Sequence, residues 1–137
     1  MLNIICVDDQ QEVLDSIIRD LRPLANDSVR LEEASDEQDC LALIDELHQD
    51  GEDIAILLTD RVMPNGSGLE MLAAIASDSR FNKTRKVILT GLPEDAESQT
   101  AQAAGHFDTY LEKPWSAEEL QQEILRQLAL YRDSVQA

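Results

Sequence analysis

A chain of 137 residues is long enough for one compact domain with its own core and leaves little room for a second. Its 28 acidic and 11 basic residues give a formal net charge of -17, which argues against direct nucleic-acid binding and favours proteins or a cation as partners. The apolar runs are too short to span a bilayer, the amino terminus lacks a signal-peptide pattern, and Cys6 and Cys40 are too few for a disulfide framework. We therefore expect a cytoplasmic protein with no membrane partner and with reduced cysteines.

The first predicted element is a central strand over residues 2–7 (LNIICV), a short β-branched apolar run that stops at Asp8 and Asp9. Apolar residues then recur at helical spacing up to Pro23. Asp9, with Glu12 three residues later, fits the N-cap of this helix. Two adjacent acids after a buried strand instead favour a cation site, and the pattern leaves both interpretations open.

Residues 29–34 alternate apolar and polar side chains, as a half-buried strand does. Ser35, with Gln38 at the capping-box position, predicts the start of a second helix that ends near Gly51. Residues 53–59 (DIAILLT) form the third predicted strand, which ends at Asp60 and leads into a turn from Pro64 to Gly68.

Ser67 and Glu70 form another capping-box pair, which predicts a third helix up to about residue 76. Residues 86–89 form a fourth strand that ends at Thr90 and Gly91. The fourth helix, over residues 93–104, opens with Pro93 and has almost no large apolar residue, so we expect it to be the most loosely held.

Residues 107–111 form the fifth predicted strand, followed directly by Lys113 and Pro114. Ser116 caps a last helix, with Glu119 at the capping-box position and Trp115 stapled onto Leu120. Its predicted buried stripe consists of Leu120, Ile124, Leu128 and Tyr131. We assign residues 1–132 to the domain and residues 133–137 to a tail.

Five strands that alternate with five helices predict an α/β fold in which a parallel sheet is covered on both faces. Such sheets reverse strand order beside the first strand, so the ends of the first and third strands lie next to each other. Asp8, Asp9 and Asp60 should then converge. Thr90 and Lys113 leave the fourth and fifth strands at the same edge.

Three carboxylates and one lysine leave this edge a formal charge of -2, which a single divalent cation would neutralise. An all-oxygen site without histidine or thiolate suits Mg²⁺. Magnesium beside a lysine and a hydroxyl is a constellation that binds phosphoryl groups, and Asp60 is the natural acceptor.

This set of residues resembles the receiver domain of two-component response regulators. The matching positions are Asp8-Asp9, Asp60 with Met63-Pro64 and Gly68, Thr90-Gly91, and Tyr110 three residues before Lys113-Pro114. The resemblance covers essentially the whole chain. It implies a flavodoxin-like doubly wound (βα)5 fold with strand order 2-1-3-4-5.

The resemblance also implies roles for individual residues. Asp60 would accept a phosphoryl group from a histidine kinase or phosphotransfer protein. Asp9, Asp60 and the backbone carbonyl of Val62 would hold Mg²⁺, and Asp8 would act through a coordinated water. Lys113 would contact the phosphoryl oxygens, and its bond to Pro114 would be cis.

In the family pattern Thr90 would bind the phosphoryl group and Tyr110 would turn inward. Together they would reshape the surface of the fourth helix, fifth strand and last helix for an output domain or a protein partner. The sequence leaves open whether the protein forms a homodimer. The domain is expected to be a phosphoacceptor rather than an enzyme. The apolar side chains of Val62 and Leu92 suggest a long-lived phosphorylated state.

Simpler interpretations stand beside these. Thr90 fits a β-branched strand end, Tyr110 a half-buried aromatic, and Lys113 a solvated lysine. His48 and His106 lack metal-ligand spacing and are interpreted as structural. A receiver-shaped interaction module that works without phosphorylation would lack an acid, the lysine or the threonine, and none is missing. An aspartyl phosphatase would need an Asp-x-Asp motif at Asp60, where Val62 stands instead.

Overall fold

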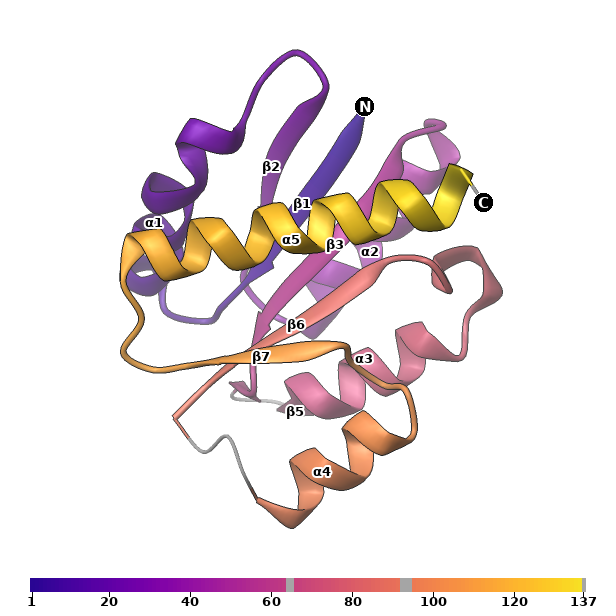
Figure 1. The fold of residues 1–137 in the computed structure, drawn as a ribbon. Helices are drawn as coiled ribbons and strands as arrows, with labels where there is room; N and C mark the ends of the chain where they lie inside the picture. The colour runs from indigo at the N-terminus through magenta and orange to yellow at the C-terminus, as the bar shows by residue number, and fades with distance from the viewer. Residues whose placement is uncertain (64–65, 92–94, 137) are drawn as a thin grey trace.

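The computed structural model describes residues 1–63, 66–91 and 95–136, and its centre is a five-stranded parallel sheet (Figure 1). The strand order is β2-β1-β3-β6-β7. In chain order along this sheet, that is the predicted order 2-1-3-4-5, so the predicted fold is confirmed. The strands are β1 (Leu2–Val7), β2 (Val29–Ala34), β3 (Asp53–Asp60), β6 (Arg85–Thr90) and β7 (Thr109–Glu112).

Helices cover both faces of the sheet (Figure 1). One face carries α1 (Gln11–Leu21) and α5 (Ala117–Gln136), whose apolar side chains pack with alternate residues of β1 and β3. The other face carries three helices, and these pack on the remaining residues of the same strands. They are α2 (Glu37–Gln49), α3 (Gly68–Ala76) and α4 (Ala96–Ala103). Two short 3-10 turns, η1 (Arg22–Leu24) and η2 (Ser79–Phe81), follow α1 and α3.

The central strands are buried on both sides, as the uninterrupted apolar runs predicted. In β1, Ile4 and Cys6 face α1 and α5, whereas Ile5 and Val7 face α2 and α3. This alternation has the period of two that a strand imposes. It separates the interior into two apolar layers, and the polar residues that follow the strands lie at the carboxyl edge of the sheet.

A second, two-stranded sheet was not predicted. Strand β4 (Val62–Met63) pairs antiparallel with β5 (Gly66–Ser67), directly after the acceptor strand. The sequence pattern had indicated only a turn here. Pro64 and Asn65, which were expected to shape that turn, lie outside the described residues.

Two predicted helix caps are confirmed, one is wrong, and the open alternative that Asp9 caps a helix is excluded. Ser67 accepts a hydrogen bond from the Leu69 N–H, and Ser116 from the Glu119 N–H. Helix α2, however, is capped by Asp36, whose carboxylate accepts from the Asp39 N–H at 2.7 Å, rather than by Ser35. The N-cap position of α1 is held by Gln10, so Asp9 is not the helix cap.

Element ends near the carboxyl third also differ from the prediction. Strand β7 begins at Thr109 rather than at residue 107, because Asp108 turns to accept a hydrogen bond from the Lys86 N–H. Helix α4 begins at Ala96 with Asp95 as its cap; the predicted start at Pro93, like Leu92, lies outside the described residues. Residues 133–136, assigned to the tail, continue α5.

None of the described helices combines the length and the apolar character needed to span a membrane.

Candidate functional site

Three carboxylates meet at the carboxyl edge of the sheet. Asp8 and Asp9 follow β1 and Asp60 ends β3, and β1 and β3 are hydrogen-bonded neighbours. One oxygen atom from each carboxylate lies within 4.8 Å of the other two. Asp8 is buried, Asp60 is half-buried and Asp9 is exposed, so the cluster opens from the interior towards solvent. The convergence expected from the strand order is therefore present.

Asp8 is the most constrained member of this cluster. Its Oδ1 accepts a hydrogen bond from the Gln10 N–H at 2.9 Å, whereas its buried Oδ2 has no hydrogen-bond partner among the described residues. Burial raises the pKa of Asp8 above its ordinary value, and the negative charges of Asp60 and Asp9 raise it further. A buried, unpaired carboxylate oxygen beside two other acids fits a site that holds a hard cation.

Lys113 supplies the positive charge of the site. It follows β7, and its Nζ lies 3.0 Å from Oδ1 of Asp60. The Lys113 N–H also donates to the carbonyl oxygen of Thr90 at 2.8 Å, which fixes the end of β7 against the end of β6. The peptide bond between Lys113 and Pro114 is cis. Lys113 is thus ion-paired with Asp60 rather than simply solvated.

Thr90 and Tyr110 belong to β6 and β7, the two strands that follow β3 in the sheet. Thr90 is buried at the end of β6. Tyr110 is half-buried on β7 and packs against the apolar layer that includes Ala101 of α4. Val62, the first residue of β4, is 66% exposed at the rim of the site. The exposed position of Val62 leaves its side chain at the surface that an incoming molecule would meet.

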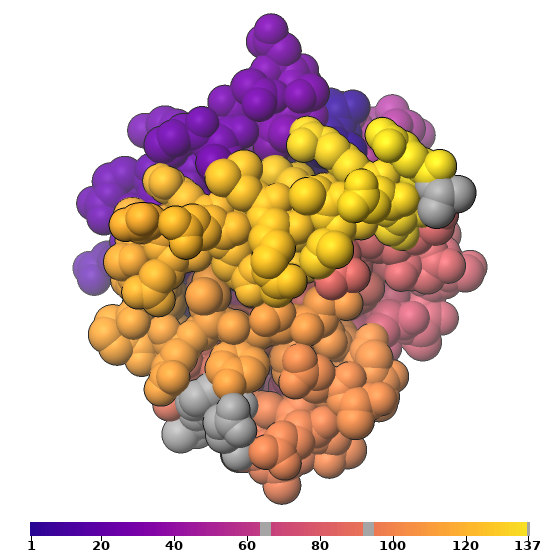
Figure 2. Space-filling view, in the orientation of Figure 1, coloured from indigo at the N-terminus to yellow at the C-terminus, as the bar shows by residue number. Residues whose placement is uncertain are grey.

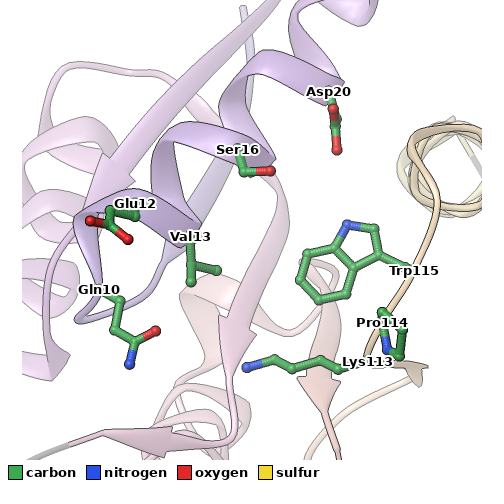
Figure 3. A pocket seen from close by; sticks show the side chains of 8 residues that line it. All are labelled: Gln10, Glu12, Val13, Ser16, Asp20, Lys113, Pro114 and Trp115. Atoms are coloured by element: carbon green, nitrogen blue, oxygen red, sulfur yellow. The ribbon is translucent and has the colours of Figure 1, made fainter.

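A groove of about 490 Å³ extends from Lys113 along α1 (Figure 3). Val13 and Ser16 of α1 form one wall, and Pro114 and the indole of Trp115 form the other. Gln10, Glu12 and Asp20 contribute the polar part of the lining. The helix staple expected for Trp115 agrees with its packing in the layer that contains Leu120. Its position on the groove was not predicted, because it depends on how α1 lies beside the loop after β7.

The two histidines lie apart from the acidic cluster. The ring of His48 packs edge-on against Phe81, with 5.8 Å between the ring centroids. His106 lines a separate groove between α3 and α4. Both positions agree with the structural interpretation.

Arg61 is the residue of this region that the sequence did not single out. Its side chain is only 9% exposed and forms ion pairs with Asp95 and Glu97 at the start of α4. A buried arginine needs such partners, but the sequence contains no signal for which acids, more than thirty residues away, would supply them.

Comparisons with known proteins agree with this geometry. The model of the response regulator receiver domain family matches residues 4–125. Chemotaxis protein CheY1 of Helicobacter pylori is 33% identical over 72 residues, which are 53% of this chain and 57% of that protein. This chain thus spans somewhat more than half of that relative's length.

Solved structures show the same fold. A CheY-like response regulator receiver domain protein from Methanospirillum hungatei JF-1 superposes with a TM-score of 0.81 at 23% identity, over 98% of each chain. The BeF3-activated receiver domain of DrrB superposes with a TM-score of 0.72 at 26% identity, over 94% of this chain and 98% of that one.

Proposed function

The chain belongs to the response regulator receiver domain family, and from that premise we propose that it is a phosphorylation-activated signalling switch in which Asp60 is the acceptor. The donor is a histidine kinase or a phosphotransfer protein. The observation that carries the proposal is the convergence of Asp8, Asp9 and Asp60 with Lys113 at one sheet edge. A family match alone would not indicate whether this chain keeps the chemical groups that the reaction needs.

The proposed reaction transfers a phosphoryl group between two side chains. A carboxylate oxygen of Asp60 forms a bond to phosphorus while the phosphorus–nitrogen bond of the donor's phosphohistidine breaks, and the electron pair leaves with the imidazole. Lys113, 3.0 Å from Oδ1 of Asp60, offers its ammonium group to the oxygens of the arriving phosphoryl group. Asp60 itself is half-buried, so the acceptor oxygen is within reach of a donor.

Asp9, Asp60 and the backbone carbonyl of Val62 would hold Mg²⁺, with Asp8 acting through a coordinated water; the ion neutralises phosphoryl charge when bound. The orphaned Oδ2 of Asp8 supports this assignment, because a buried acceptor without a donor is satisfied by a cation or its water. Burial also raises the pKa of Asp8, because it removes water from the charged carboxylate.

The proposed output is a change in the surface formed by α4, β7 and α5. Thr90 would hydrogen-bond the phosphoryl group, and half-buried Tyr110 would turn inward with it. An output domain or a separate protein would then read this surface. We assign no direct nucleic-acid contact to the domain, because its net charge is -17.

The test is incubation with Mg²⁺ and acetyl phosphate, followed by intact-mass measurement. The wild type should gain one phosphoryl group, Asp60→Ala none, and Lys113→Ala much less. Asp27→Ala is the matched control, since Asp27 is exposed in a loop away from the site, and it should be labelled like the wild type. Chelation of Mg²⁺ should abolish labelling.

The alternative is a receiver-like interaction module that works without phosphorylation. It predicts that the wild type stays unlabelled at any Mg²⁺ concentration and that Asp60→Ala binds its partner as the wild type does. Labelling that survives in Asp60→Ala would contradict Asp60 as the acceptor.

A further inference from the structure

Arg61 joins the acceptor strand to α4. It follows Asp60 directly, and its buried guanidinium lies 2.5 Å from Oδ2 of Asp95 and 3.2 Å from Oε2 of Glu97. A guanidinium removed from water is costly unless acids compensate its charge. Both of these acids belong to the first turn of α4 or its cap. The start of that helix is therefore held by the residue next to the acceptor.

Asp95 has two attachments. Its Oδ1 accepts a hydrogen bond from the Ser98 N–H at 2.9 Å, which caps α4, and its Oδ2 pairs with Arg61. The hydrogen bonds from Ser98, together with the charge of Arg61, hold the pKa of Asp95 below its ordinary value. One carboxylate thus connects the backbone of α4 to the acceptor segment.

Helix α4 has little apolar attachment to replace this connection. Among its residues only Ser98 and Ala101 are buried, and neither side chain is large. A groove of about 420 Å³ separates it from α3, with Leu69 and Ala73 on one side and Glu97 and Ala101 on the other. Because side-chain burial contributes so little here, the ion pairs of Arg61 carry a large share of the attachment.

The backbone around Arg61 is held firmly to its neighbours. The Arg61 N–H donates to the carbonyl oxygen of Leu89 at 3.2 Å, and the Arg61 carbonyl accepts from the Gly68 N–H at 2.6 Å. Gly68 lies so close to the acceptor that an added Cβ would collide with the Asp60 carbonyl oxygen. Because this backbone is tightly packed, a displacement of Asp60 should also displace Arg61.

We propose that Arg61 couples the state of Asp60 to the position of α4 through its ion pairs with Asp95 and Glu97. The inference rests on the proposed function, because the change that Arg61 would transmit to α4 is the addition of an anionic phosphoryl group to Asp60. That group adds negative charge one residue from Arg61 and competes with the two acids of α4 for it. The competition weakens the attachment of α4, and it does so by a route separate from Thr90 and Tyr110.

The test is amide hydrogen exchange in α4 (residues 96–103), measured with and without Mg²⁺ and BeF3⁻. The variants are Arg61→Met, which keeps side-chain length, and Asp95→Asn, which keeps a capping oxygen but removes the charge. Arg19→Met, at an arginine that is 74% exposed on α1, is the matched control.

In the unloaded proteins, α4 should exchange about five- to tenfold faster in Arg61→Met and Asp95→Asn than in the wild type or the control. Loading with BeF3⁻ should accelerate α4 exchange in the wild type and the control, and should change it little in the two variants. If Arg61→Met does not fold, Asp95→Asn provides the test, because Asp95 is only half-buried and asparagine keeps an oxygen for the helix cap.

The outcomes separate the two proposals when phosphorylation by acetyl phosphate is measured in parallel. If Arg61→Met is labelled and its α4 responds to BeF3⁻ as the wild type does, the coupling is overturned and the proposed function stands. Unchanged α4 exchange in the unloaded variants would equally overturn the coupling. If the wild type is not phosphorylated and does not bind BeF3⁻, the proposed function is contradicted, and so is the coupling through Arg61.

Discussion

Helices α5 and α4 pack on opposite faces of one sheet (Figure 1) and are attached by different forces. In Figure 2, α5 (yellow) runs across the middle of the molecule and α4 (orange) lies at its lower edge. Helix α5 buries a stripe of large side chains, as predicted: Leu120, Ile124, Leu128 and Tyr131. Helix α4 buries only Ser98 and Ala101, and Arg61 holds its start. Hydrophobic burial gives α5 one stable position, whereas an element held by ion pairs can be displaced by a change in local charge.

The largest expected effect concerns this difference in attachment. Ile124→Ala should lower the free energy of unfolding by about 3 kcal/mol, because it opens a cavity beneath α5 at a side chain with no exposure. Ala101→Gly on α4 should cost about 1 kcal/mol, mainly through helix propensity. Urea denaturation measures both values. Equal losses from the two helices would contradict the comparison.

The close approach of α3 to the acceptor predicts the next effect. Gly68→Ala should cost about 2 kcal/mol or more, because its Cβ collides with the Asp60 carbonyl oxygen, and it should impair phosphorylation by displacing Asp60. Gly51→Ala is the matched variant: its positive φ of 77° makes alanine strained, but its Cβ meets no described atom within 4 Å. It should cost about 1 kcal/mol and leave phosphorylation intact.

The raised pKa of Asp8 should make the stability of the fold depend on pH. Because burial raises its folded-state pKa above the ordinary 3.8, the stability it contributes is present below that value and is lost as the pH rises through the raised pKa. Asp8→Asn keeps an oxygen for the Gln10 N–H and removes this loss. Without Mg²⁺ it should be more stable than the wild type at pH 7, and Mg²⁺ should stabilise the wild type more than the variant.

The smallest expected effect concerns the lifetime of the phosphorylated state. Val62 is exposed at the rim of the site and cannot position water. Val62→Asn should speed the decay of the aspartyl phosphate about fivefold, or about 1 kcal/mol of activation free energy. The decay is followed by intact mass after removal of acetyl phosphate, and an unchanged rate would contradict this role for Val62.

What the sequence could predict depended on the range of the interactions. The adjacency of the first and third strands and the caps at Ser67 and Ser116 follow from general topology rules and local patterns, so they were predicted correctly, whereas the full strand order came from the family resemblance. Ser35 and Asp36 are adjacent residues that can both cap a helix, and only the backbone decides between them. The pairing of β4 with β5 depends on loop geometry after Asp60, which composition does not encode.

The residues of the candidate site also differ in how far the sequence could predict their positions. Asp8, Asp9, Asp60 and Lys113 converge because each directly follows or ends a strand of a predictable sheet. Arg61 pairs with Asp95, which is distant in sequence and caps a helix whose predicted start, Pro93, lies outside the described residues. An ion pair between a buried arginine and the half-buried cap of a distant helix follows no periodic sequence pattern, so only the structure could reveal it.

The most direct test of the account is a crystal structure of the protein with Mg²⁺ and BeF3⁻. We expect beryllium bonded to a carboxylate oxygen of Asp60, a fluoride in contact with Nζ of Lys113, and the metal ion among Asp8, Asp9 and Asp60. BeF3⁻ bound elsewhere, or a metal ion outside this acidic cluster, would contradict the assignment of Asp60 as the acceptor.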